Sequence, residues 1–436
     1  MIFGGLADDL TGGLELAAML VAEGVPSLLV TSARAVPSVI DAHVVVVAQK
    51  TRIAPAAEAR ERFDAAAQVL LAGGARQLFF KYCATFDSTD QGNIGPCIEV
   101  LMQRTGSRFT ACCPTFPEYQ RAVFQGHLFV ADRLVSESPK RDDPVTPMRD
   151  PDLVRVLQRQ TSQRVGLIAH ADIRAGAAAI QRRAAQLQAE GIGCAIADAA
   201  VHEDLQHLAA ATVDWPLMTG GSSIAAHYPP LWRARGWLGA GGLPVTLPNV
   251  TGPGVVLAGS CAEQTRRQLE HFSMTHPTLT LDLEACSRGA DVLADALAWA
   301  TARLAQQPVA ISTSAAPDAV ARLQSRLGVA AAAALAEQLL GRIAAGLRDA
   351  GVRRFVVAGG ETSGAVLEHL GVERLRVGPF AGPSLPLALD DGRAAADPLI
   401  LCLKSGKLGP LDAFGVALDA MAAGSDQHDR ISERSQ

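Results

Sequence analysis

The sequence predicts an α/β protein of two domains, each a mainly parallel sheet flanked by helices. Short apolar runs of strand length alternate with amphipathic stretches of helical length, which is typical of parallel sheets. The chain has 436 residues, enough for two hydrophobic cores. A Gly-rich segment ending in Pro, residues 235–244, marks a boundary. We therefore expect domains at residues 1–245 and 246–424, followed by a disordered, charged tail at 425–436.

The composition indicates a cytoplasmic protein that acts on small molecules. The net charge is −5, which gives no indication of a nucleic-acid or membrane partner. We find no signal peptide and no apolar run of about 18 residues, the length that a membrane helix needs. The eight Cys include no C-x-x-C pair and fall mostly in apolar runs, as expected for reduced thiols. No Cys/His spacing fits a zinc site, so we expect no metal site made by the protein itself.

The first domain opens with a strand at residues 2–7, a turn at 8–13 and a helix at 14–23. Another strand follows, so these elements form a βαβ unit of a parallel sheet. Functional sites in such sheets lie beyond the carboxyl ends of the strands, where Asp8 and Asp9 fall. Adjacent carboxylates repel, and holding both there requires a cation, basic partners or solvent. The alternative is that one Asp caps the helix and the other is solvated.

Two more strands, at residues 44–48 and 77–81, also end in polar groups. These groups are Lys50 and Arg52 after the first strand, and Lys81, Asp87 and Ser88 after the second. Lys and Arg gathered at one sheet edge would bind an anionic small molecule, and Arg suits a carboxylate because it can donate two hydrogen bonds. Plain solvated residues at strand ends are the alternative for any single position.

The rest of the first domain continues the alternation. We expect strands at residues 109–113, 164–168 and 193–197, and one long helix at 171–190. Residues 125–130 predict a hairpin strand beside the sheet, which could pair across a homodimer. His127 in this strand is read as a structural histidine rather than a ligand contact.

The second domain predicts strands at residues 255–258, 278–282, 309–313, 355–358, 387–389 and 399–404. Three of these strands end in distinctive turns, which are Gly259-Ser260, Gly359-Gly360-Glu361-Thr362 and Lys404-Ser405-Gly406-Lys407. Backbone amides, hydroxyls and a Lys at one edge suit the phosphates of a nucleotide.

Residues 354–371 are the clearest of these segments. They predict a strand, a Gly turn and a helix, with Thr362 or Ser363 as the N-cap and Gly371 just past the C-terminus. A Gly-rich turn before a helix attracts phosphate. The segment is neither a Walker A loop, because Ala365 stands where Lys is needed, nor G-x-G-x-x-G. A turn that binds nothing is the alternative for this segment taken alone.

The two domains together predict a kinase. An anionic substrate would bind the first domain and a nucleotide the second, with the reaction in the cleft between them.

Several motifs, taken in order, resemble the four-carbon acid sugar kinase family. They are L-A-D-D-L-T-G at 6–12, K-Y-C-A-T-F-D-S-T at 81–89, G-N-I-G at 92–95, Q-G-H-L-F-V at 125–130, G-G-E-T-S-G at 359–364 and L-K-S-G at 403–406. The second and fourth motifs are most similar to those of 3-oxo-tetronate kinases.

The resemblance implies an enzyme that transfers the γ-phosphate of ATP to the terminal hydroxyl of a tetronate or 3-oxo-tetronate. It implies substrate contacts at Asp8, Arg52, Lys81, Tyr82, Cys83 and Ala84. It implies ATP contacts at Ser260, Gly359, Gly360, Glu361, Thr362 and Gly406, and we add Lys404 as a neighbour of the phosphates.

Three positions depart from the family pattern. The family's T-G-A-x-D is Thr11-Gly12-Gly13-Leu14-Glu15 here, and its K-S-G-N-F-G is Lys404-Ser405-Gly406-Lys407-Leu408-Gly409. A G-M-R-H-H-P-like loop is replaced by residues 138–144, in which Asp142 and Asp143 stand in place of two His. That change of charge leaves open which four-carbon acid is preferred.

We expect an in-line phosphoryl transfer that depends mostly on positioning and charge stabilisation. Asp8 or Asp9 would orient or deprotonate the attacking hydroxyl, with Asp87 as the reserve candidate. Mg²⁺ would arrive bound to ATP and keep several waters.

Two other classes remain open from the residues alone. A non-catalytic sugar-acid sensor would need the anion cluster but not the phosphate turns. An NAD-dependent oxidoreductase is disfavoured, because both the glycine fingerprint and the ribose-binding acid are missing.

Overall fold

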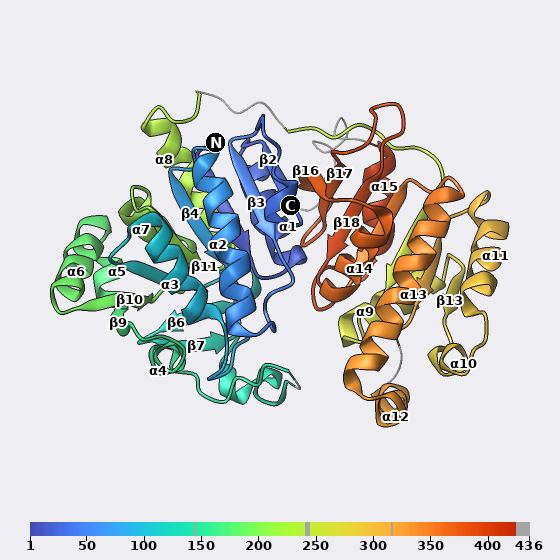
Figure 1. Cartoon of the computed structure of the whole chain (residues 1–436), viewed down its shortest axis with the longest axis horizontal. Coiled ribbons are helices and arrows are strands. Elements are labelled where there is room, and N and C mark those ends of the chain that lie inside the picture. The colour runs from blue at the N-terminus through green and yellow to red at the C-terminus, as the bar shows by residue number, and fades with distance from the viewer. Residues whose placement is uncertain (144, 240–244, 315–316, 424–436) are drawn as a thin grey trace. The chain divides into compact units, whose positions relative to one another are not determined.

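The computed structural model describes residues 1–143, 145–239, 245–314 and 317–423, with the side chains of 317–319 left out (Figure 1). The chain divides into two compact units, Met1–Pro244 and Val245–Gln436. The end of the Gly-rich boundary segment, 240–244, and the predicted disordered tail at 425–436 both lie outside the described residues.

Unit 1 is built on an eight-stranded sheet whose strand pairs are all parallel, in the order β2-β3-β1-β4-β11-β5-β10-β9. The strands are β1 (Phe3–Ala7), β2 (Ser27–Val30), β3 (Val44–Ala48), β4 (Gln77–Lys81), β5 (Thr110–Cys113), β9 (Arg164–Ile168), β10 (Ile192–Ala197) and β11 (Leu217–Gly220). The helices are α1 (Leu10–Ala22), α2 (Ala56–Ala72), α3 (Ile94–Thr105), α4 (Leu153–Gln158), α5 (His170–Arg174), α6 (Ala177–Ala189), α7 (His202–Thr212) and α8 (Tyr228–Ala234).

Burial explains why the central strands are nearly continuous apolar runs. Helices cover a parallel sheet on both faces, and all five residues of β3, Val-Val-Val-Val-Ala, are buried. The buried face of α2 includes Phe63, Ala67 and Leu70, which belong to the same hydrophobic core cluster as residues of β3. In the sheet register Ala7 lies opposite both Ala48 and Lys81, so the segments that follow β1, β3 and β4 leave the sheet at one level.

One expectation for unit 1 was wrong in detail and another is confirmed. The long helix expected at 171–190 is two helices, α5 and α6, because Gly176 between them has a φ of +86°, which ends the first helix. The expected hairpin strand is confirmed as β7 (His127–Val130), which pairs antiparallel with β6 (Arg121–Phe124) in a small separate sheet that also contains β8 (Arg133–Leu134). Pairing of this sheet across a homodimer stays a prediction.

Unit 2 has a sheet in the order β13-β14-β12-β15-β18-β17-β16, in which the first four strand pairs are parallel and the last two pairs are antiparallel. The strands are β12 (Gly254–Ala258), β13 (Thr278–Thr280), β14 (Val309–Ser312), β15 (Arg354–Ala358), β16 (Arg374–Phe380), β17 (Pro386–Asp390) and β18 (Ile400–Lys404). The helices are α9 (Glu263–Ser273), α10 (Leu283–Ser287), α11 (Val292–Leu304), α12 (Pro317–Leu327), α13 (Val329–Asp349), α14 (Gly360–Leu370) and α15 (Ala413–Ala423). The prediction of two mainly parallel α/β sheets is confirmed.

One helix in the described part of unit 2, α13, is long and apolar enough to cross a membrane by length and composition. The expectation that no stretch reaches this length was therefore wrong. A core helix passes the same test, so a single such helix is weak evidence for a membrane span. Its residues Leu339, Leu340, Ile343 and Leu347 are buried inside unit 2.

Candidate active site

The two aspartates after β1 have different surroundings. Helix α1 begins at Leu10, so the turn expected at 8–13 was wrong. Asp9 is the N-cap: its Oδ1 accepts a hydrogen bond from the Gly12 amide at 2.8 Å, and its Oδ2 accepts one from the Thr11 hydroxyl at 3.0 Å. One Asp therefore caps the helix, but the other is not solvated, because Asp8 is buried.

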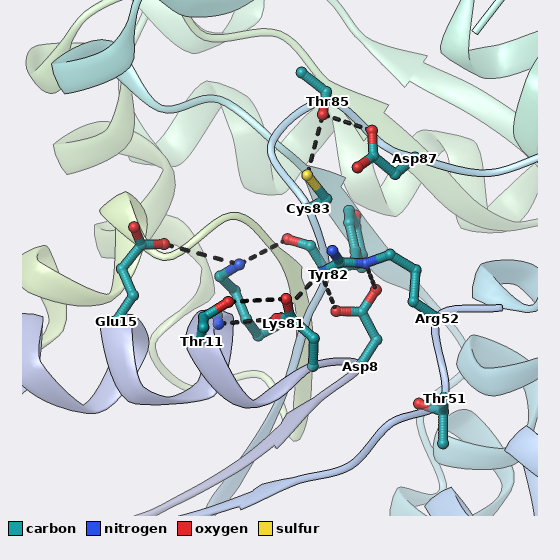
Figure 2. Close-up of polar contacts among 12 residues, drawn as sticks. Asp8, Thr11, Glu15, Thr51, Arg52, Lys81, Tyr82, Cys83, Thr85 and Asp87 are labelled. Carbon is teal, nitrogen blue, oxygen red and sulfur yellow. Dashed lines mark hydrogen bonds and ion pairs between the residues drawn. The ribbon is translucent and has the colours of Figure 1, made fainter. Parts of the chain in front are cut away.

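Arg52 neutralises this pair of carboxylates. Its Nε and Nη2 donate to the two oxygens of Asp8 at 2.9 and 2.8 Å, and Nη2 also lies 3.1 Å from Asp9 Oδ1 (Figure 2). Asn93 fixes the loop that carries Arg52, because its amide donates to the carbonyls of Thr51 and Ala54 at 2.6 and 3.0 Å. Basic partners thus hold the two adjacent carboxylates together.

Lys81 ends β4 with its side chain 4% exposed. Its Nζ donates to the Tyr82 carbonyl at 3.0 Å and lies 3.9 Å from Glu15 Oε2 (Figure 2). Glu15 also accepts a hydrogen bond from the Ser222 hydroxyl at 2.8 Å. The sequence hypothesis missed Glu15. A predicted helix that began at Leu10 would have included Thr11 and Glu15 on one face, four residues apart. That spacing would have placed Glu15 at the site.

A second chain of polar contacts leads away from Cys83. The Cys83 sulfur lies 3.0 Å from the Thr85 hydroxyl, which donates to Asp87 Oδ1 at 2.6 Å (Figure 2). Lys140 lies 2.7 Å from the same oxygen of Asp87 and 2.8 Å from Asp143. Lys140 comes from the loop whose charge departs from the family pattern. Sequence reasoning missed this residue because the loop has no periodicity that would place it.

The structure therefore brings Asp8, Asp9, Arg52 and Lys81 together, and it places Cys83 beside Asp87. Tyr82 contributes its backbone carbonyl, since its buried hydroxyl is 3.1 Å from Thr219 Oγ1. Ala84 is partly exposed in the same loop.

Burial and charge act in opposite directions on these acids. Burial raises the pKa of Asp8 although Arg52 opposes it, and burial raises the pKa of Glu15 against the charge of Lys81. Burial also acts to raise the pKa of Asp9, but Arg52 and Lys81 outweigh it and lower that pKa. For Asp87, burial is likewise outweighed, here by Lys140 and Arg52, and the pKa falls. Asp9 and Asp87 are thus fixed as carboxylates.

In unit 2, the turns after β12, β15 and β18 leave the sheet side by side. Ala258, Ala358 and Lys404 lie opposite one another in the parallel register. The Gly359 amide donates to the Lys404 carbonyl at 3.0 Å, which joins the second turn to the third.

Small residues allow these turns to approach each other closely. A Cβ at Gly406 would collide with the Ser260 hydroxyl, and a Cβ at Gly259 would collide with the Thr362 hydroxyl. Thr265 fixes the third turn, because its hydroxyl donates to the Gly406 carbonyl at 2.7 Å. Ser260, Gly359, Thr362 and Gly406 are therefore gathered at one edge.

Helix α14 begins earlier than expected. Its N-cap is Gly359, whose φ of +123° only Gly adopts readily, so the expected cap at Thr362 or Ser363 was wrong. Helix α14 ends before Gly371, which has the left-handed conformation expected of it. The amides of Gly360, Glu361 and Thr362 begin this helix and therefore lie at the positive end of its dipole.

The Lys404 side chain is less accessible than we expect for a residue that binds phosphate. Its side chain is fully buried, with Nζ donating to the Ser405 carbonyl at 2.8 Å and lying 5.8 Å from the centre of the Phe414 ring. Burial lowers the pKa of Lys404 to about 8.

Comparisons with known proteins match both units. The family model described as a sugar-binding N-terminal domain covers residues 3–228, and that of a nucleotide-binding C-terminal domain covers residues 255–414. The chain is 46% identical to a 3-oxo-tetronate kinase of Burkholderia multivorans, over 96% of this chain and 97% of that protein. It is equally identical to one from Cupriavidus necator, over 96% of each.

The chain belongs to the four-carbon acid sugar kinase family. The resemblance found in the motifs is thus confirmed. A crystal structure of a Haemophilus influenzae protein is 34% identical with a TM-score of 0.75, and the match covers 96% of this chain and 100% of that one. The family models thus describe the domain of unit 1 as sugar-binding and that of unit 2 as nucleotide-binding.

Proposed function

We propose that this protein is an ATP-dependent kinase that phosphorylates the terminal hydroxyl of a four-carbon sugar acid of the 3-oxo-tetronate, threonate or erythronate type. The observation that carries the proposal is the 46% identity to 3-oxo-tetronate kinases over nearly the whole chain. The charged edge of unit 1 suits an anionic, hydroxylated substrate, and the Gly turns of unit 2 suit the phosphates of ATP.

Asp8 is our candidate for the general base. Burial raises its pKa toward the working pH of an enzyme, which favours proton transfer, and each of its oxygens retains a lone pair beyond the one used by Arg52. Asp9 is the weaker candidate, because Arg52 and Lys81 outweigh burial and lower its pKa, and its oxygens cap helix α1. Asp87 is the reserve candidate rather than the first, because one of its oxygens already contacts both Lys140 and Thr85. Arg52 would hold Asp8 in place, and Lys81 would contact substrate hydroxyls.

In unit 2, the α14 amides from Gly360 to Thr362 would bind phosphate oxygens, with Ser260, Gly359 and Gly406 shaping the space around them. Mg²⁺ would neutralise phosphate charge when bound with ATP. In the described part of the chain no group of three or more His, Cys, Asp and Glu could hold a metal ion. The phosphates and water would therefore supply most of the magnesium ligands.

Release of ADP tests the proposal. The purified chain is supplied with Mg-ATP and, in turn, D- and L-threonate, D- and L-erythronate and their 3-oxo forms. We expect turnover with at least one of these acids and a phosphorylated product. Failure with every acid, by folded protein that binds ATP, would contradict the proposal. Reduction of NAD by a sugar acid without ATP would instead favour an oxidoreductase.

A further inference from the structure

The positive side chains at the unit 1 edge differ in how they are neutralised. Arg52 uses two of its N–H groups on Asp8, Lys140 lies within 2.8 Å of both Asp87 and Asp143, and Lys81 has Glu15 at 3.9 Å. Arg52, Lys81 and Lys140 therefore each already have a carboxylate of the protein beside them. A substrate carboxylate that took their place would leave a buried acid without its partner, which is costly.

Arg121 is the exception at this edge. It is partly exposed, and its Nη1 donates to the Tyr119 carbonyl. Within residues 1–143, 145–239 and the described part of unit 2, no carboxylate lies within 4 Å of its guanidinium. A guanidinium has five N–H donors in a planar fork, so one carbonyl leaves most of them available.

The position of Arg121 is fixed by the backbone. It opens β6, directly after the segment that leaves β5, and its amide and carbonyl pair with those of Phe116 at 3.0 and 2.9 Å. Gln120 before it has a φ of +57°, which turns the chain back tightly. Strand β5 neighbours β11, and β11 neighbours β4, so this turn follows a strand at the same carboxyl edge as Lys81.

One charge that acts on Arg121 belongs to the same site. It is that of the Asp87 carboxylate, on the loop after β4, which acts to raise the pKa of Arg121. Burial lowers the pKa of Arg121, but an arginine remains protonated at neutral pH. Arg121 is thus a partly buried cation close to the loop that the family resemblance assigns to substrate.

We propose that Arg121 binds the carboxylate of the sugar acid. This inference rests on the proposed function, because it names the group that recognises the acid end of that substrate. Arg52 and Lys81 then organise Asp8 and the hydroxyls, and Arg121 distinguishes an acid from an uncharged polyol. The planar fork of the guanidinium matches the two oxygens of a carboxylate.

The test compares Arg121→Gln, Arg121→Lys and wild type, with Arg133→Gln as the matched control. Arg133 lies in the same small sheet, with its side chain 66% exposed. We expect Arg121→Gln to raise KM for the sugar acid roughly 10- to 100-fold, as expected for losing hydrogen bonds to a charged group. The KM for ATP should stay within twofold, Arg121→Lys should recover part of the loss, and Arg133→Gln should match wild type.

Calorimetric titration with L-threonate and with threitol, both without ATP, tests the charge dependence directly. We expect Arg121→Gln to weaken threonate binding and leave threitol binding unchanged, whereas a structural defect would weaken both. Threonate binding that is unchanged in folded Arg121→Gln would overturn the inference while leaving the kinase proposal intact. If threonate binding depends on Arg121 but the wild-type protein transfers no phosphate, the inference stands and the kinase proposal is contradicted.

Discussion

The two polar edges of this protein are built by different means. At the edge of unit 1, charged side chains from distant parts of the chain face one another in the pairs Asp8–Arg52, Glu15–Lys81 and Asp87–Lys140. At the edge of unit 2, three backbone turns approach each other, and Gly259, Gly359 and Gly406 leave room for that approach.

This difference predicts which kind of substitution should disturb each edge. An edge made of paired charges is disturbed when one charge is removed, because its buried partner is left unmatched. An edge made of backbone amides is disturbed when a methyl group is added where two turns touch. Charge changes should therefore act on the sugar acid, and small steric changes should act on ATP.

The largest effect is expected from Asp8→Asn. Removing the general base should lower kcat about 10²- to 10⁴-fold, because that is the usual contribution of positioned proton transfer. ADP release at saturating sugar acid and ATP gives the value, and circular dichroism checks the fold, since Arg52 loses an ionised partner. Near-normal turnover would exclude Asp8 as the base and direct attention to Asp87.

The next largest effect is expected in the pH dependence of stability, and it comes from Lys404 at the edge of unit 2. Burial lowers the pKa of Lys404 from 10.5 to about 8, so between these values the unfolded chain binds more protons than the native protein. Stability from this group therefore rises with pH from about 8 to about 10.5, by roughly 3 kcal/mol.

Lys404→Met removes this dependence. Urea unfolding of both proteins from pH 7 to pH 10.5 should show wild type gaining stability relative to the variant as pH rises. Parallel curves for the two proteins would mean that Lys404 titrates normally and that its ammonium group is hydrated.

A smaller effect is expected from Gly406→Ala. The added methyl group collides with the Ser260 hydroxyl, so the first and third turns must separate. We expect KM for ATP to rise about tenfold and KM for the sugar acid to stay unchanged.

Gly415→Ala is the control, since the residue is inside α15 and, apart from the backbone of that helix and its chain neighbours, no described atom lies within 4 Å of the added methyl group. This substitution should leave both KM values unchanged and add up to about 1 kcal/mol of stability. Equal effects of the two substitutions on ATP would argue against a site made by the three turns.

The sequence predicted the parallel sheets well, because their buried strands are apolar runs bounded by turns. It also identified Asp8, Asp9, Arg52 and Lys81, because residues that follow adjacent parallel strands must meet at one edge. The family motifs named the class of enzyme.

The pairing of those residues could not be read from the sequence. Lys140 reaches Asp87 from a loop without periodicity, and Arg121 depends on a tight turn at Gln120. Helix starts were also misplaced. Helix α1 begins at Leu10, four residues before the predicted start, and Gly359 caps α14 three or four residues before Thr362 or Ser363. That the two edges meet in a cleft stays a prediction.

The central proposal is that the edge of unit 1 binds the sugar acid and the edge of unit 2 binds ATP. Calorimetric titration of ATP into full-length Asp8→Asn and Gly406→Ala tests it. Asp8→Asn should bind ATP within twofold of wild type, and Gly406→Ala should bind it about tenfold more weakly. Loss of ATP binding in Asp8→Asn, with wild-type affinity in Gly406→Ala, would contradict the proposal.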